Sequence, residues 1–221
     1  MPFLAIDLLF FGANLMKVLD GGYVPLLVAA LVVTIVRVWM EGTRLLAIRE
    51  ARMETPLPEL LDMLGRRPPA TISGAAIYLT AHADHAPVAL LHTLKHFGSL
   101  HERNLILTVA TADVPRVPDA GRVRFERLDD RFCRATMTFG YMEAPDVPHG
   151  LDMSPDLARE FDAATASFIV SRRTLKPAAD GAMPAWRSRL FIFLARNAAG
   201  ATDYFRIPAG RVVEIGTQVN L

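Results

Sequence analysis

The 221-residue sequence contains a single cysteine, Cys133, and carries almost no net charge. One cysteine excludes a framework of disulfide bonds within the chain and is compatible with a reducing cytosol. The 24 basic and 23 acidic residues give a formal net charge of +1. This balance favours neither a nucleic-acid-binding surface nor an acidic tail, so we expect no nucleic-acid partner.

The sequence also lacks the motifs of common enzyme and metal sites. It has no glycine-rich phosphate-binding pattern, no HEXXH pair and no readable Ser–His–Asp arrangement. His92 and His96 have the i, i+4 spacing that can bind zinc, but Lys95 lies beside them and would repel a cation. Cys133 faces the apolar side of an alternating strand pattern, where no neighbour would activate it as a nucleophile. We therefore predict no catalytic residue, no metal site and no cofactor.

Charge is scarcest in the first forty residues, which hold two apolar runs on either side of an Asp-Gly-Gly turn. The second run is about long enough to cross a hydrocarbon core of ~30 Å. Its charge, Arg37, lies near its end, and Tyr23 and Trp39 mark its edges as interfacial aromatic residues do. We predict a transmembrane helical hairpin over residues 1–40, with a truncated first helix at about 3–19 and a complete second helix at 23–40.

Basic residues on the C-terminal side of the second run set the expected orientation. Arg37, Arg44, Arg49 and Arg52 lie there, and the positive-inside rule places such a side in the cytoplasm. We therefore expect a multi-pass protein of the cell inner membrane with its C-terminal domain in the cytoplasm. Two alternatives are a cleaved signal peptide, which would need a basic segment before the apolar run, and a buried hairpin of a soluble protein.

Polar residues interrupt the first apolar run. Asp7 and Asn14 are a heptad apart and share a helix face. We favour a hydrogen-bonding seam between helices for this pair and keep both as weak candidates for ion binding, because an acid inside a membrane is often functional. Gly21 and Gly22 fit a tight turn, and Pro25 fits the first turn of the helix that follows.

The rest of the sequence has the pattern of an α/β domain with a mixed sheet. We expect residues 41–70 to form a cytosolic linker with a short helix at Leu57–Leu64, and residues 71–221 to form a cytosolic C-terminal domain. Apolar and alternating runs predict strands, whereas prolines and glycines mark the expected starts and ends of helices. The expected strands are 75–80, 105–110, 122–128, 133–141, 167–171 and 211–219, and the expected helices are 88–97, 154–166 and 186–198.

Eight motifs in series resemble one family of transporters. They are IDLLFFGANLMKVLDGGYVPLL (6–27), GAAIYLT (74–80), LKHFGSLHE (94–102), PRV (115–117), FGYMEAP (139–145), RLFIFLARNA (189–198), FRIP (205–208) and RVVEIGTQV (211–219). Together they resemble the end of the membrane region and the cytosolic domain of the Kup-type potassium uptake family (KUP/HAK/KT).

The resemblance implies roughly a dozen membrane helices in an APC-type (LeuT-like) fold, proton-coupled potassium symport and a homodimer. The positions that bind potassium and couple protons would lie on earlier helices, so the chain would be a fragment, a truncated product or one subunit of a split transporter. Potassium ion, proton and lipid bilayer are then the expected partners. The resemblance marks seven positions as structural: Gly21, Gly22, Pro25, His96, His101, Glu102 and Gly216.

The leading hypothesis is the C-terminal portion of a potassium transporter, acting as a structural or regulatory part because two helices cannot form the ion site of such carriers. The alternative is a membrane-anchored regulatory module. In that case a nucleotide or second messenger would bind at the carboxyl ends of the parallel strands.

Overall fold

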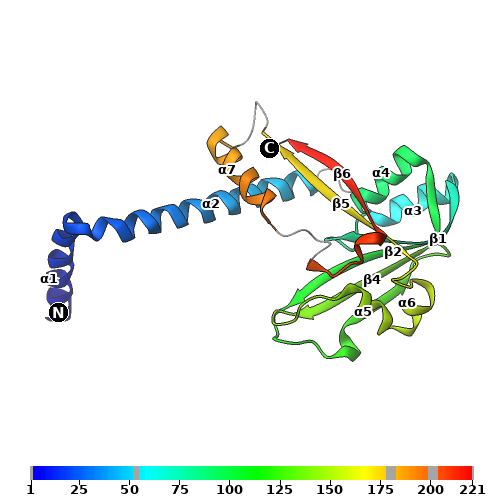
Figure 1. Cartoon of the computed structure of the whole chain (residues 1–221), viewed down its shortest axis with the longest axis horizontal. Helices are drawn as coiled ribbons and strands as arrows, with labels where there is room; N and C mark the ends of the chain where they lie inside the picture. The colour runs from blue at the N-terminus through cyan, green and yellow to red at the C-terminus, as the bar shows by residue number, and fades with distance from the viewer. Residues whose placement is uncertain (1, 52–54, 178–182, 199–203, 221) are drawn as a thin grey trace. The chain divides into compact units, whose positions relative to one another are not determined.

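The computed structural model describes residues 2–51, 55–177, 183–198 and 204–220 (Figure 1). By their contacts the residues form two compact units. The first comprises the residues up to Ile48 together with Pro177–Arg196, and the second comprises Arg49–Lys176 and Asn197–Asn220. The single domain expected at 71–221 stays a prediction. By its contacts, α7 (Ala185–Arg196) groups with the N-terminal helices.

The N-terminal helices are α1 (Pro2–Lys17) and α2 (Tyr23–Ala51), joined by a π-helical segment, Val18–Gly22. The expected tight turn is therefore wrong in type, although its glycine is used: Gly21 has a φ of 113°, which glycine adopts readily. Helix α2 also continues well beyond the expected end at residue 40. Its extension is rich in Leu, Ala, Arg and Glu, which favour helix, so part of the predicted linker is helical.

Helix α2 is long and apolar enough, by length and composition, to cross a membrane over Tyr23–Arg49. Only 6% of its most apolar stretch is buried. The large apolar side chains of α1, such as Phe3 and Phe10, are also exposed. The alternative of a soluble hairpin packed in a core of this chain is therefore wrong for the described residues.

The second unit contains a six-stranded sheet in the order β3-β4-β2-β1-β5-β6. Figure 1 labels β1, β2, β4, β5 and β6 of this sheet. Only β3 pairs antiparallel to its neighbour, so the sheet is mixed, as predicted. The strands are β1 (Ala70–Thr80), β2 (Ser99–Ala112), β3 (Val123–Arg127), β4 (Phe132–Gly140), β5 (Ser167–Lys176) and β6 (Val212–Asn220). The helices are α3 (Leu57–Arg66), α4 (Val88–Phe97), α5 (Val147–Asp152) and α6 (Pro155–Glu160), with short 3₁₀ turns at Asp119–Gly121 and Ala209–Arg211.

Each face of the sheet carries its own hydrophobic core, because successive side chains of a strand point to opposite faces. On β1, Ile77 belongs to one core, while Ala76 and Tyr78 belong to the other. The first core includes Val147 and Leu151 of α5, Leu157 of α6 and the β4 residues Cys133, Ala135 and Met137. The second includes Leu57 and Leu60 of α3 and Leu90 of α4. The unit is thus a helix–sheet–helix sandwich.

One predicted helix is much shorter than expected. The helix expected at 154–166 ends at Glu160, because Phe161 leaves helical geometry with its side chain fully buried in the first core. Asp162 then holds a turn, since its carboxylate accepts a hydrogen bond from the N–H of Ala164 at 2.9 Å. Such local side-chain bonds to the backbone compete with helix formation.

Candidate functional site

The order of the strands creates a switch point beside β1. From β1 the chain moves to β2 and then β4 on one side, and it later returns to place β5 and β6 on the other side. The strand order therefore reverses its direction between β1 and β5. In open α/β sheets, ligands bind in the crevice outside the carboxyl ends of strands at such a point.

A pocket of about 270 Å³ lies at this switch point. The pairing of Tyr78 with Ile169 brings Val170 and Ser171 of β5 level with the end of β1. The pocket volume is close to the lower limit of ~300 Å³ for small-molecule sites. Its lining residues are Leu79, Thr80, Ala81, His82, His85, Ala86, Val88, Leu107, Val109, Val170, Ser171, Arg173 and Phe205.

The lining combines an apolar body with a few polar groups. Leu107, Val109 and Phe205 provide the apolar surface, and Arg173 provides a positive charge. The rings of His82 and His85 meet edge to face, with their centroids 6.2 Å apart. This composition fits a small ligand with an apolar body and an anionic group.

The loop that forms one wall of the pocket is tied to the segment that precedes α3. The N–H of Ala86 donates to the carbonyl of Thr55 at 2.9 Å, and the N–H of Leu57 donates to the carbonyl of Asp84 at 3.0 Å. The carboxylate of Asp84 also accepts a hydrogen bond from Arg134 at 2.6 Å. The pocket wall is therefore held by the part of the chain that follows α2 in sequence.

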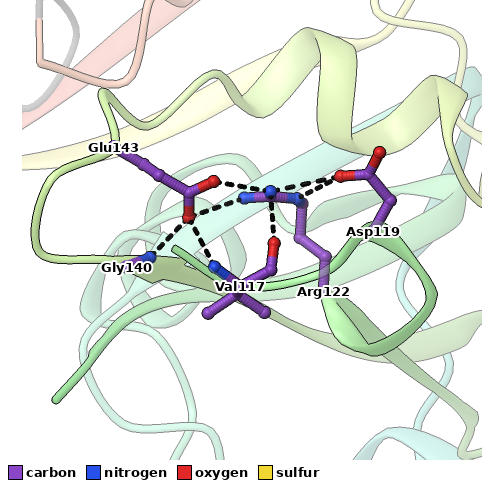
Figure 2. A network of polar contacts seen from close by, with 5 residues as sticks. All are labelled: Val117, Asp119, Arg122, Gly140 and Glu143. Carbon is purple, nitrogen blue, oxygen red and sulfur yellow. Dashed lines mark hydrogen bonds and ion pairs between the residues drawn. The ribbon is translucent and has the colours of Figure 1, made fainter. Parts of the chain in front are cut away.

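A second polar cluster joins the loops after β2 and β4. Figure 2 shows the Arg122 guanidinium between the carboxylates of Glu143 and Asp119. Arg122 donates to Glu143 at 2.8 and 3.2 Å, to Asp119 at 3.2 and 3.3 Å and to the Val117 carbonyl at 2.7 Å. Glu143 in turn accepts from the backbone N–H groups of Gly140, at 2.6 Å, and Val117, at 3.1 Å.

The cluster stabilises the charged form of Glu143. Hydrogen bonds from Arg122 and from the Gly140 N–H lower the pKa of the Glu143 carboxyl from 4.5 to about 2. The side chains of Arg122 and Glu143 are only 9% and 17% exposed. Gly140 has no room for a side chain, because a Cβ there would meet the backbone of Pro115. We interpret the cluster as a structural lock between two loops.

Two family models match the chain in order. The model described as "K+ potassium transporter integral membrane domain" matches residues 1–44. The model described as "K+ potassium transporter C-terminal domain" matches residues 73–221, which is more than half of the chain. The chain belongs to the K+ potassium transporter family. Its apolar N-terminal helices thus correspond to that family's membrane domain, which argues against a signal peptide.

Curated relatives support the same family. The chain is 49% identical over 220 residues to the "Probable potassium transport system protein Kup 2" of Rhodopseudomonas palustris strain BisB18, covering all of this chain and 35% of that relative. It is 48% identical over 219 residues to the Kup protein of Brucella anthropi, covering 99% of this chain and 34% of the relative. The chain thus spans about a third of the length of these relatives. No solved structure matches it.

The family resemblance marked residues whose positions the structure now gives. Gly21 and Gly22 lie in the π-helical segment, Pro25 lies in the first turn of α2, and Asp7 and Asn14 are exposed on α1. The roles of Asp7 and Asn14 stay predictions.

The remaining motif positions are spread over the second unit. His96 stacks on His92, with centroids 5.6 Å apart in the last turns of α4. Glu102 accepts a hydrogen bond from the N–H of Gly74 at 3.3 Å, where β1 has an irregularity in its pairing with β2. Burial lowers the pKa of His101, and Gly216 pairs with Arg172 between β6 and β5.

The structural roles expected for the histidines stay predictions, and the structure gives the surroundings of the cysteine. Among the described residues, no group of three or more His, Cys, Asp or Glu side chains could hold a metal ion. Cys133 is 3% exposed within the first core, and burial raises the pKa of its thiol to about 11. A thiol with this pKa is protonated at neutral pH and is a poor nucleophile.

The edge of the sheet where the pocket lies is the one expected from the sequence, whereas the Arg122–Glu143 lock was not expected. A signal for the lock existed, because Glu143 and Val117 belong to two of the quoted family motifs. Spacing alone does not show that these loops meet, since the contact depends on β2 and β4 being neighbours.

Proposed function

We propose that this chain forms the C-terminal part of a proton-coupled potassium uptake transporter: the end of its membrane region and a cytosolic α/β domain. The observation that carries the proposal is the order of the two family matches in one chain. The membrane-domain match includes most of a helix that is long enough to span a bilayer, and the C-terminal-domain match includes a compact mixed sheet. The relatives are named as potassium transport system proteins. Potassium ion and proton would be handled by upstream helices of the full transporter.

The orientation follows from charge. Arg37, Arg44 and Arg49 all lie in the C-terminal half of α2, which favours a cytoplasmic location for that end and for the sheet domain behind it. The membrane is then the inner membrane, and the protein crosses it more than once.

Association with the upstream part of a relative tests this assignment. The upstream part of the Rhodopseudomonas relative, tagged and co-expressed with this chain, should retain the chain on affinity purification in detergent. A matched control lacks residues 1–44 of this chain and should be lost from the purified material. Failure of the full chain to co-purify, while it is present in the membrane, would contradict the proposal.

A second function is regulation by a small ligand at the switch-point pocket, with a nucleotide or second messenger as the ligand class. Arg173 and the histidine pair can meet an anionic group, and the apolar wall can receive a base. The pocket loop is hydrogen-bonded to Thr55 and Leu57. A ligand that moves this loop would therefore act on the connection to α2.

Thermal unfolding of the full chain with a panel of nucleotides and cyclic dinucleotides tests the pocket. A binding nucleotide should raise the midpoint in a concentration-dependent way, because it binds the folded state. Ala81→Trp, which fills the pocket from an exposed loop position, should abolish the shift. The matched variant Ala120→Trp, on an exposed turn outside the pocket, should keep it. No shift with any nucleotide would contradict this function.

The full transporter is proposed to be a homodimer through the cytosolic domain. β3 and β6 are the edge strands of the sheet, and edge strands present unpaired backbone groups to another chain. Light scattering in detergent should give the mass of two chains, and a single-chain mass at high concentration would contradict the dimer.

A further inference from the structure

We propose that α7 is an interfacial helix that lies on the anionic headgroups of the same membrane that α2 crosses. The inference rests on the proposed function, in which α2 spans the bilayer and its C-terminal end faces the cytoplasm. It assigns a lipid partner to a helix that lies within the C-terminal-domain match of residues 73–221, far along the sequence from the apolar N-terminal runs.

Helix α7 has two distinct faces. Ser188, Phe191 and Ile192 are buried on one of them. The other face carries exposed residues at positions 186, 189, 193 and 196, which lie on one side of a helix at intervals of three and four residues. These residues are Trp186, Arg189, Phe193 and Arg196, so aromatic rings alternate with guanidinium groups along the stripe.

The buried face docks on α2 at the end of its apolar run. The rings of Phe191 and Trp39 are 5.6 Å apart, and Phe191 also packs directly on Gly42, where a Cβ would collide with its ring. Arg187 forms an ion pair with Glu41 at 3.1 Å. These contacts fix α7 at the level of Trp39–Gly42.

That level is the one at which α2 should leave the membrane. Trp39 closes the apolar run, and tryptophan concentrates at the membrane–water interface. A helix held beside Trp39 therefore lies at headgroup depth on the side that the arginines of α2 make cytoplasmic. The location follows from contacts within the first unit alone.

The composition of the exposed stripe fits this location. Trp186 and Phe193 are 54% and 63% exposed, and two exposed rings on one stripe of a helix suit insertion into the headgroup region. Helix α7 contains no acidic residue, and Arg189 and Arg196 are exposed on the same stripe. Guanidinium groups pair with phosphate, and basic residues are drawn to the anionic cytoplasmic leaflet.

Lipid quenching of single tryptophans tests the proposal, because the chain has only two, Trp39 and Trp186. In Trp39→Phe the remaining signal reports α7, and in Trp186→Phe it reports the end of α2. Both variants of the full chain would be reconstituted into bilayers containing lipids brominated near the headgroup end of the acyl chains. We expect quenching of both tryptophans, and stronger quenching of Trp186 in phosphatidylglycerol bilayers than in phosphatidylcholine.

Reversing the charge of arginines on α7 distinguishes an electrostatic contact with the anionic headgroups from mere closeness of the helix to the bilayer. In the Trp39→Phe background, Arg189→Glu with Arg196→Glu should abolish the extra quenching in phosphatidylglycerol. The matched control, Arg103→Glu with Arg116→Glu, makes the same change in net charge at exposed positions of the sheet domain and should leave it intact.

The outcomes distinguish this inference from the proposed function. If Trp39 is quenched but Trp186 is not, α7 is off the bilayer and the inference is overturned, while the placement of α2 stands. A blue-shifted Trp186 shielded from both bromolipid and acrylamide would show that protein covers the stripe, which also overturns it. If neither tryptophan is quenched, the membrane placement of α2 fails, and the inference fails with it.

Discussion

Glu143 shows how a single carboxylate can hold two loops together. It accepts hydrogen bonds from Arg122 and from two backbone N–H groups, so its ionised form is favoured in the folded state. The two neighbouring carboxylates differ in their surroundings, because Glu143 is 17% exposed and Asp119 is 72% exposed. We expect Glu143 to carry most of the stability of the lock.

The lock predicts an acid-sensitive contribution to stability. The folded-state pKa of Glu143 is depressed to about 2 from 4.5. Its contribution is therefore fully present above about 4.5 and is lost as the pH falls towards 2. Glu143→Gln should lower the thermal unfolding midpoint at pH 7. In thermal melts at a series of pH values, the midpoint of this variant should also fall less between pH 4.5 and pH 2 than that of the unchanged chain. Asp119→Asn should change the midpoint far less, and an equal effect of both would contradict the lock.

Gly74 lies where β1 breaks register, with a φ of 101°. A side chain strains this backbone, so Gly74→Ala should destabilise the sheet domain by about 1–3 kcal/mol in urea unfolding. The control is Gly216→Ala on β6, where a Cβ meets open space. Alanine there should be neutral or slightly stabilising, because glycine weakens a strand interior. Equal loss at the two positions would argue against backbone strain at Gly74.

Among the elements, α7 and α2 meet at a close contact between Gly42 and Phe191. Gly42→Ala should undock α7 despite alanine's better helix propensity, because overpacking costs about 1–3 kcal/mol. Phe191→Leu added to it should relieve part of the clash while keeping an apolar side chain against α2, so the double variant should be less proteolysed around α7 than Gly42→Ala alone. Gly65→Ala in α3, with open space around the site, should leave protection of α7 unchanged. Equal cleavage in all variants would show that the contact does not hold α7.

A helix or strand could be predicted well where the residues that begin and end it can be recognised in the neighbouring sequence. The helix at 88–97 was predicted with its observed ends, because Pro87 precedes it and Gly98 closes it with a φ of 63°. The strand predicted at 105–110 covers most of the buried part of β2. The outer residues of β2 are mostly polar and more exposed, and the buried Leu100 stands alone among them without forming an apolar run. The helix predicted at 154–166 was too long, because the burial of Phe161 ends it and no local pattern shows that.

The candidate site was predictable only in part for a similar reason. From the βαβ pattern, a ligand could be expected at the edge of the sheet that the carboxyl ends of the parallel strands form. The pocket itself combines β1, β2 and β5 with Phe205, which lies far along the chain. The position of β5 beside β1 is a property of the sheet topology.

At the scale of the whole molecule, one chain joins a membrane helix to a ligand-sized pocket through a short connection. Helix α2 ends at Ala51, and Thr55 already pairs with the pocket loop at Ala86. α7 returns from the sheet domain to contact α2 at Trp39. Among the described residues, the chain therefore passes between the two units at three places, Ile48–Arg49, Lys176–Pro177 and Arg196–Asn197.

Potassium uptake by cells that lack their own uptake systems is the most direct test of the proposed function. The cells would express this chain alone, the upstream part of the Rhodopseudomonas relative alone, or both. We expect uptake and growth at limiting potassium only with both parts, because two helices cannot form the ion site by themselves. No uptake with both parts, although both are stable in the membrane and the intact relative transports, would contradict a role in potassium transport.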